Sequence, residues 1–222
     1  MNERLEYFDQ MKGLGMILVV MGHVMLFTFK INPSEPSRFI YFNMPMFFYI
    51  SGYLAYKQIN TLGDLGNRIV RRGIMLMVPY LVFSTLYGIF ADLPNMGQNL
   101  LSGRSGYWFL YDLFVISLFF LVWEWFTRHI ENDYISVCLW VLPFILLMSA
   151  KYVIARFDNG MYYSMISNLV NYYRYYLIGY LCRKYVRFND VVFKNDLVAA
   201  IGFVLYFLNW YYFDMHNMLL IF

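Results

Sequence analysis

Charged residues are scarce in this chain of 222 residues: they make up 14% of the sequence, whereas a soluble domain carries about 25%. Hydrophobic residues reach 61%, and aromatic residues alone account for 22%. A soluble fold of this length has too little interior to bury so much apolar surface. The composition therefore excludes an ordinary soluble domain and indicates a protein solvated by lipid.

Cysteine and net charge are also low. Cys138 and Cys182 lie inside apolar runs, and two thiols provide neither a disulfide framework nor a metal cluster. The formal net charge is +3, and the basic residues stand at segment ends, which argues against a nucleic-acid partner. No cleavage pattern follows the mixed charges of the first twelve residues, so we expect the first apolar segment to remain as a signal anchor.

Several apolar segments approach the roughly 20 residues that a membrane helix needs. They cover residues 12–29, 39–56, 73–91, 107–126, 134–154, 162–182 and 197–213. They are apolar on all sides, which favours helices over the alternating strands of a barrel. We predict an all-α protein, a polytopic transmembrane helical bundle of about seven spans, with residues 1–222 forming a single membrane domain.

The end of the chain and the distribution of basic residues carry two further predictions. Residues 218–222 start another apolar run, so we expect either a short interfacial stub or a domain whose C-terminal part is missing. Lys and Arg are about twice as frequent in the connections on the N-terminal side of the membrane as on the other side. The positive-inside rule then places the N-terminus in the cytoplasm.

Ionisable residues inside membrane segments are functional candidates, because burying a charge in lipid is costly. Lys12 and His23 would lie about 16 Å apart along one helix, with Lys12 at the cytoplasmic interface and His23 past the middle of the bilayer. We expect His23 to be buried in the bundle, where a neutral imidazole could act as a base. A histidine that hydrogen-bonds a neighbouring helix is the other interpretation.

Asp112 and Arg174 are the other two such residues, and we expect them to form a structural ion pair. Arg68, Arg71 and Arg72 form a basic cluster before the third segment. The cluster is typical of a cytoplasmic helix end, and its guanidinium groups could equally bind phosphates.

Small and aromatic residues suggest how the helices pack. Ser51 and Gly52 permit the close approach of another helix. Trp108, which opens the fourth segment, is typical of an interfacial anchor. The tyrosines that crowd residues 162–180 could line a sugar site or serve as interface and packing residues.

Motifs in the first four segments, and one in the segment 162–182, resemble those of the acyltransferase-3 family of membrane acyltransferases, particularly bacterial polysaccharide O-acetyltransferases. The first segment resembles the family's signature of a basic residue and a histidine, with Lys12 in the place that is usually arginine and His23 as the histidine. The later motifs are Met44-Pro45 to Tyr53, Arg68-x-x-Arg71 with Val78-Pro79-Tyr80, Trp108-Phe109-Leu110, and Tyr176-Leu177-Ile178-Gly179-Tyr180. Family members usually have about ten spans, so about seven would make an incomplete domain.

The resemblance implies an enzyme of the bacterial cytoplasmic (inner) membrane. It would move an acetyl group from acetyl-CoA, the acyl donor, to a sugar hydroxyl of a cell-surface polysaccharide or its lipid-linked precursor, without a metal. The residues that it implies are His23 and Lys12 for catalysis, and Arg68, Arg71, Arg72 and Trp108 for the donor. His23 would act either as a general base or through an acetyl-histidine. The alternatives are a transporter or flippase for a lipid-linked saccharide and an inactive truncated remnant.

Overall fold

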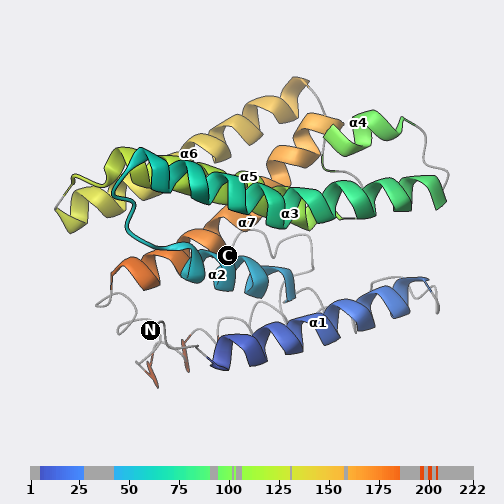
Figure 1. Ribbon diagram of the computed structural model, residues 1–222, viewed down its shortest axis with the longest axis horizontal. Coiled ribbons are helices and arrows are strands. Elements are labelled where there is room, and N and C mark those ends of the chain that lie inside the picture. The colour runs from blue at the N-terminus through green and yellow to red at the C-terminus, as the bar shows by residue number, and fades with distance from the viewer. Residues whose placement is uncertain are drawn as a thin grey trace.

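The computed structural model describes residues 6–27, 43–90, 95–101, 103, 107–130, 132–157 and 160–185, and five positions between 196 and 204. Every regular element in these ranges is a helix, which confirms the predicted all-α bundle (Figure 1). The helices are α1 (Glu6–Phe27), α2 (Asn43–Ala55), α3 (Leu62–Phe90), α4 (Met96–Leu101), α5 (Trp108–Thr127), α6 (Asp133–Phe157) and α7 (Met161–Lys184).

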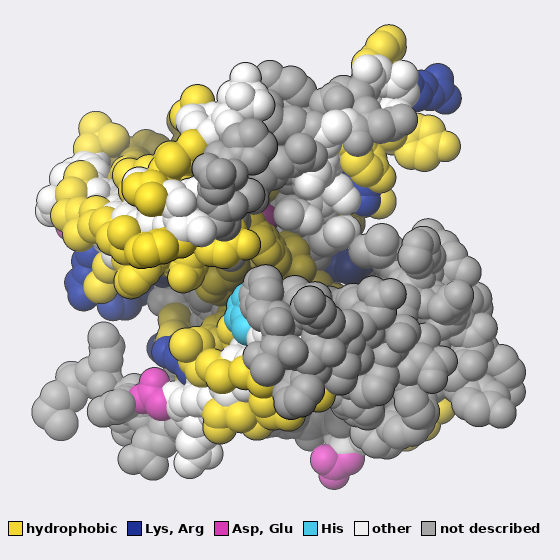
Figure 2. All heavy atoms as spheres, turned by 90° about the vertical axis from the view of Figure 1, so that its right-hand side faces the viewer, with side chains coloured by type: hydrophobic (Ala, Val, Ile, Leu, Met, Phe, Trp, Pro, Cys, Tyr) yellow, Lys and Arg dark blue, Asp and Glu magenta, His cyan; other side chains and the backbone are white. Residues whose placement is uncertain are grey.

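Three of the described helices are long and apolar enough to cross a membrane. They are α3, α5 and the part of α6 from Ile135 to Phe157. Hydrophobic side chains predominate among the described residues on the face shown in Figure 2, as expected for a surface in contact with lipid. Helix α2 has 13 residues and is therefore shorter than a span. The predicted segment at 197–213 lies almost entirely outside the described residues.

Helix α3 begins at Leu62, well before the predicted start at residue 73. Its N-terminus is capped by a reciprocal pair of hydrogen bonds. The backbone N–H of Asp64 donates to Thr61 Oγ1 at 3.1 Å, and that of Thr61 donates to Asp64 Oδ2 at 3.3 Å. This capping box starts the helix in a polar stretch that hydropathy does not detect. The extra turns carry the arginine cluster.

Helices α2 and α7 cross closely because each has a glycine at the contact. A Cβ on Gly52 would overlap the carbonyl oxygen of Tyr176, and a Cβ on Gly179 would overlap that of Tyr49. The predicted close approach at Gly52 is therefore confirmed, and its partner is α7.

An aromatic core fills the space between α5, α6 and α7. The ring of Phe120 lies at its centre, 4.6 Å from Tyr176, 4.8 Å from Trp140, 5.0 Å from Tyr180 and 5.2 Å from Tyr173, measured between ring centroids. These three tyrosines are almost completely buried. Their rings pack in this core, which agrees with the packing role that the sequence allowed for them.

Helix α1 packs on one side of the bundle, mainly against α2, and the two run in opposite directions (Figure 1). The ring of Phe8 lies 4.7 Å from that of Tyr53, and Gly15 faces Met46. Leu14, Ile17 and Val20 point away from this contact and are exposed. In the part of the chain that the structure describes, a narrow stripe therefore joins α1 to α2, and these three apolar side chains lie outside it.

Candidate functional site

Basic residues that are distant in the sequence meet at one end of the bundle. Here the α2–α3 loop, the turn after α5 and the last turn of α7 come together, as contacts of Arg128, Lys184 and Arg183 with other elements show. We call this the basic end and define it by Lys57, Arg68, Arg71, Arg72, Arg128, Arg183 and Lys184. All seven belong to the set that the sequence placed on the N-terminal side of the membrane.

Two arginines of the basic end hold the α2–α3 loop. The terminal nitrogens of Arg68 donate to the carbonyl oxygens of Lys57 and Gln58, both at 2.6 Å. Arg128 donates to the carbonyl oxygen of Asn60 at 3.0 Å. Both terminal nitrogens of Arg68 are therefore engaged by backbone carbonyl groups of the α2–α3 loop.

A buried ion pair lies beside the loop. Glu124 Oε2 accepts hydrogen bonds from Lys184 Nζ and from the hydroxyl of Tyr180, both at 2.7 Å. Burial, and to a smaller extent the Glu124 carboxylate, raise the pKa of the nearby Tyr56 phenol. The sequence analysis missed Glu124, although an acidic residue inside the segment 107–126 meets the rule for ionisable groups in a membrane.

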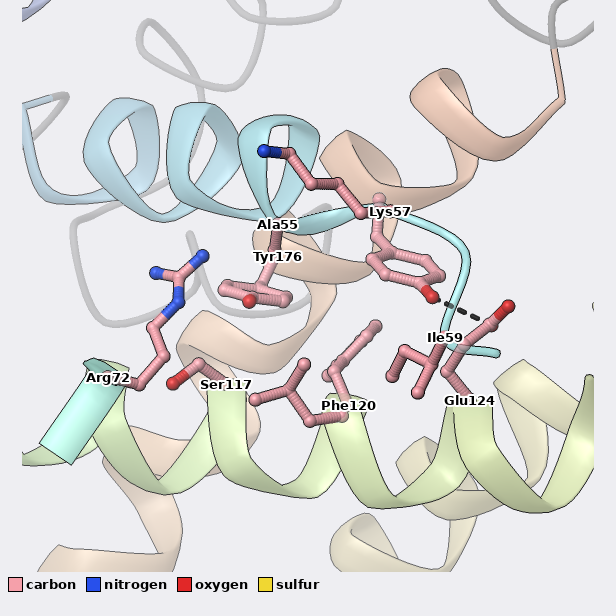
Figure 3. Close-up of a pocket in the computed structure, with 10 residues that line it drawn as sticks. Ala55, Lys57, Ile59, Arg72, Ser117, Phe120, Glu124 and Tyr176 are labelled. Carbon is pink, nitrogen blue, oxygen red and sulfur yellow. Dashed lines mark hydrogen bonds between the residues drawn. The ribbon is translucent and has the colours of Figure 1, made fainter. Parts of the chain in front are cut away.

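A pocket opens between the loop and helices α3, α5 and α7 (Figure 3). It is a narrow hollow, partly open to solvent, with about 10 Å³ of free space, which is room for about one water molecule, and Arg72, Ser117, Glu124 and Tyr176 are among its polar lining residues. Arg72 extends from α3 toward Tyr176, and Ser117 lies below both of them in this view, on α5. The pocket thus joins a guanidinium group to two hydroxyl groups.

Arg72 is the one predicted donor-binding residue that lines this pocket. Arg71 is exposed on the same helix. Trp108 stands about 14 Å from Ser117 along α5, and its ring lies 5.3 Å from that of Tyr172. The structure therefore brings the three arginines to one end and places Trp108 about two and a half helical turns away.

The two predicted catalytic residues lie on α1, away from the pocket. Lys12 Nζ is 3.6 Å from Asp9 Oδ1 in a partly exposed pair. His23 is exposed, so the expectation that it is buried in the bundle is wrong for the described structure. The reason is that the buried stripe of α1 runs through Phe8 and Gly15, and His23 lies beside that stripe.

The predicted ion pair between Asp112 and Arg174 is not formed. Asp112 Oδ2 is buried and finds no hydrogen-bond partner among the described residues. Arg174 Nε donates to the carbonyl oxygen of Asn171 at 3.1 Å, and its guanidinium lies 5.0 Å from the ring centre of Tyr175. Asp112 and Arg174 belong to the neighbouring helices α5 and α7, but Asp112 faces the protein interior and Arg174 contacts residues of its own helix.

Comparison with known proteins gives one finding that covers nearly the whole chain. A family model of the acyltransferase-3 type, described as an acyltransferase domain, matches residues 5–222. No significant match was found among curated proteins or among solved structures.

Proposed function

The chain belongs to the acyltransferase-3 family and is a membrane acyltransferase, and we propose that it transfers an acetyl group from acetyl-CoA to a sugar hydroxyl. The acceptor is a cell-surface polysaccharide or its lipid-linked precursor, and the membrane is the bacterial inner membrane. The observation that carries this proposal is the family match over residues 5–222, together with the gathered cations of the basic end. With those cations in the cytoplasm, the N-terminus lies there as well.

The donor has phosphate groups that suit the basic end. Guanidinium groups bind phosphates through two parallel hydrogen bonds, and Arg71 and Arg72 are turned away from the loop contacts that engage Arg68. We assign Arg71 and Arg72 to the phosphates and Arg68 to the loop beside them. Trp108, further along α5, would then contact the acyl end of the donor.

His23 supplies the base in this proposal. Its imidazole takes the proton of the sugar hydroxyl while the hydroxyl oxygen attacks the thioester carbonyl carbon. The carbon–sulfur bond breaks, and the imidazolium returns the proton to the departing thiolate of coenzyme A. In the acetyl-histidine route, the His23 nitrogen attacks first and the sugar displaces it. Lys12 either contacts a donor phosphate or orients α1.

The test measures the release of free coenzyme A thiol by the purified chain in liposomes, with acetyl-CoA and an oligosaccharide acceptor. We expect His23→Ala to reduce acceptor-dependent release by about 10²–10⁴-fold, because a general base contributes that much. Met21→Ala, also exposed on α1, is the matched control and should keep the wild-type rate.

Two results would count against this function. A wild-type rate in His23→Ala would exclude the imidazole from the chemistry. An absence of thiol release from the wild-type protein with every saccharide tested, despite correct membrane insertion, would reject acetyl-CoA as the donor.

A further inference from the structure

Helix α7, which lies between α2 and α6, carries polar residues on the side that does not face the aromatic core (Figure 1). Its rings Tyr173 and Tyr176 pack on Phe120 of that core. On the opposite side, half-buried polar residues recur every three or four positions, the spacing of one helix face. We call them the polar stripe: Ser164, Ser167, Asn168, Asn171, Arg174 and Tyr175. The stripe explains why α7, although 24 residues long, is not among the described helices apolar enough to cross a membrane.

The polar stripe leads from one end of the bundle toward its middle. Ser164 lies in the first turn of α7, at the end opposite the basic end, and Arg174 lies about 15 Å further along the helix. About the same distance separates Arg174 from Lys184 of the basic end. With the basic end in the cytoplasm, as proposed above, the stripe begins at the outer side of the membrane. Acyl chains offer no hydrogen bonds, so amide and hydroxyl groups at this depth require a polar partner.

Two cations at the polar stripe have no acidic partner among the described residues. Lys151 Nζ, on α6, lies 6.0 Å from the ring centre of Tyr163, and the guanidinium of Arg174 lies 5.0 Å from that of Tyr175. The positive charges of Lys151 and Arg174 are close enough to repel each other. From residue 134 to residue 184 the sequence has a single acidic residue, Asp158, which lies outside the described residues. Aromatic rings attract cations but leave their charge uncompensated, so the two cations favour an anion as the partner.

We propose that the polar stripe, together with Lys151, binds an acidic saccharide whose carboxylate lies between Lys151 and Arg174. The inference rests on the proposed function, in which the acceptor is a saccharide, and it specifies that this acceptor is acidic. An arginine fork matches the two oxygens of a carboxylate. The amides of Asn168 and Asn171 each provide donors and an acceptor, which suits sugar hydroxyl groups.

The depth of Arg174 favours a saccharide over an anionic phospholipid. The hydrocarbon core of a bilayer is about 30 Å thick, and lipid headgroups lie outside it. Arg174 stands about 20 Å from the start of α7 and about 15 Å from its end, and thus near the middle of such a core. A headgroup at the outer interface is suitably placed for Ser164 but not for Arg174, whereas a saccharide chain that follows the stripe contacts both.

A matched pair of saccharides tests the proposal. The probes are a tetrasaccharide of alternating glucuronic acid and N-acetylglucosamine, and the same tetrasaccharide with its carboxyl groups reduced to alcohols. Each is titrated into the full-length protein in nanodiscs of neutral lipid, without acetyl-CoA. We expect the wild type to bind the acidic probe about tenfold or more tightly than the neutral one, the effect of hydrogen bonds to a charged group.

Substitutions at the two cations should remove this preference. Arg174→Gln and Lys151→Gln should each weaken binding of the acidic probe about tenfold and leave binding of the neutral probe unchanged. Arg174→Lys keeps the charge and should retain part of the preference. Both Gln variants should melt at or above the wild-type temperature, because each removes an uncompensated charge from a membrane segment. Unfolding would then not explain the weaker binding.

Arg156→Gln is the matched control. Arg156 is a cation on the same helix as Lys151, but it is exposed, and its guanidinium lies 5.9 Å from the ring centre of Tyr152. Five positions along α6 turn it to a different side from Lys151. This variant should bind both probes as the wild type does. An equal loss of acidic-probe binding in Arg156→Gln and Arg174→Gln would reduce the effect to overall charge and overturn the site.

Two other anions would overturn the proposal by neutralising the cations. If Asp158 does so, Asp158→Asn lowers the melting temperature of the wild type but not that of Arg174→Gln, and the wild type binds both probes equally. If a lipid headgroup does so, phosphatidylglycerol raises the melting temperature of the wild type more than that of Arg174→Gln, again with equal binding of the probes.

Failure of this site differs from failure of the proposed function. Arg174-dependent binding of the acidic probe, without acetyl transfer to it, would reject the function and keep the saccharide site. Equal acetyl transfer to the acidic and the neutral probe, unaffected by Arg174→Gln, would reject the site and keep the function.

Discussion

The basic end and helix α1 are held by different kinds of contact. At the basic end, polar bonds connect residues that are far apart in the sequence, such as Arg128 with Asn60 and Lys184 with Glu124. Among the described residues, helix α1 packs mainly against α2 through an apolar stripe, and Leu14, Ile17 and Val20 are exposed. The donor side of the proposed site is therefore fixed by polar contacts between distant segments, whereas the described packing of the helix that carries His23 is mainly an apolar contact with α2.

The largest expected effect comes from breaking the buried ion pair. Lys184→Ala should lower the free energy of unfolding by about 3–5 kcal/mol, because Glu124 would remain buried without its cation. Urea unfolding in detergent micelles measures this loss. Replacing both partners by Leu should restore most of the stability. If Lys184→Ala lowers the free energy of unfolding by less than about 1 kcal/mol, the ion pair with Glu124 behaves like a solvent-exposed pair. The basic end would then not be held more firmly than helix α1.

The glycine contact between α2 and α7 should give an intermediate effect. Gly52→Ala should destabilise the protein by about 1–3 kcal/mol, because the added methyl group overlaps the Tyr176 carbonyl oxygen and pushes the helices apart. Gly66→Ala is the control, since a Cβ at Gly66 meets nothing within 4 Å and alanine is the better helix former. Equal unfolding midpoints for these two variants would contradict the close crossing.

The smallest effect on stability should come from Lys12. Its pair with Asp9 is partly exposed, so Lys12→Ala should cost only about 0.2–0.5 kcal/mol. The thiol-release assay should nevertheless show roughly a tenfold loss of transfer, as expected if a charged contact with the donor is removed. Lys12→Arg should retain activity, because arginine keeps the charge. Unchanged transfer in Lys12→Ala would limit this residue to anchoring α1.

Features that depend on local sequence were predicted well. The segment predicted at 107–126 is helix α5, Trp108–Thr127, and that at 162–182 is α7, Met161–Lys184. Apolar runs specify such helices because backbone N–H and C=O groups in lipid must form their hydrogen bonds within the segment. Gly52 was found for a similar reason, since a small residue in a membrane segment marks a close helix contact whatever the partner.

Features that depend on the rotation of helices about their axes were not predicted. Asp112 and Arg174 lie on adjacent helices, yet the sequence does not reveal that they face different neighbours. Tyr176 was one of many tyrosines, and only the packed structure shows that its hydroxyl has no hydrogen-bond partner among the described residues. The loop contact of Arg128 joins residues far apart in the chain, beyond what motif spacing can show.

Photolabelling tests the central claim most directly, namely that a donor whose phosphates lie at the basic end presents its acyl group to His23. The probe is a coenzyme A thioether with a diazirine at the acyl end, applied to the wild-type protein in liposomes. We expect labelled peptides from α1 around His23 and loss of labelling in Arg72→Gln. Labelling that never reaches α1, while excess acetyl-CoA still competes for the probe, would contradict the account.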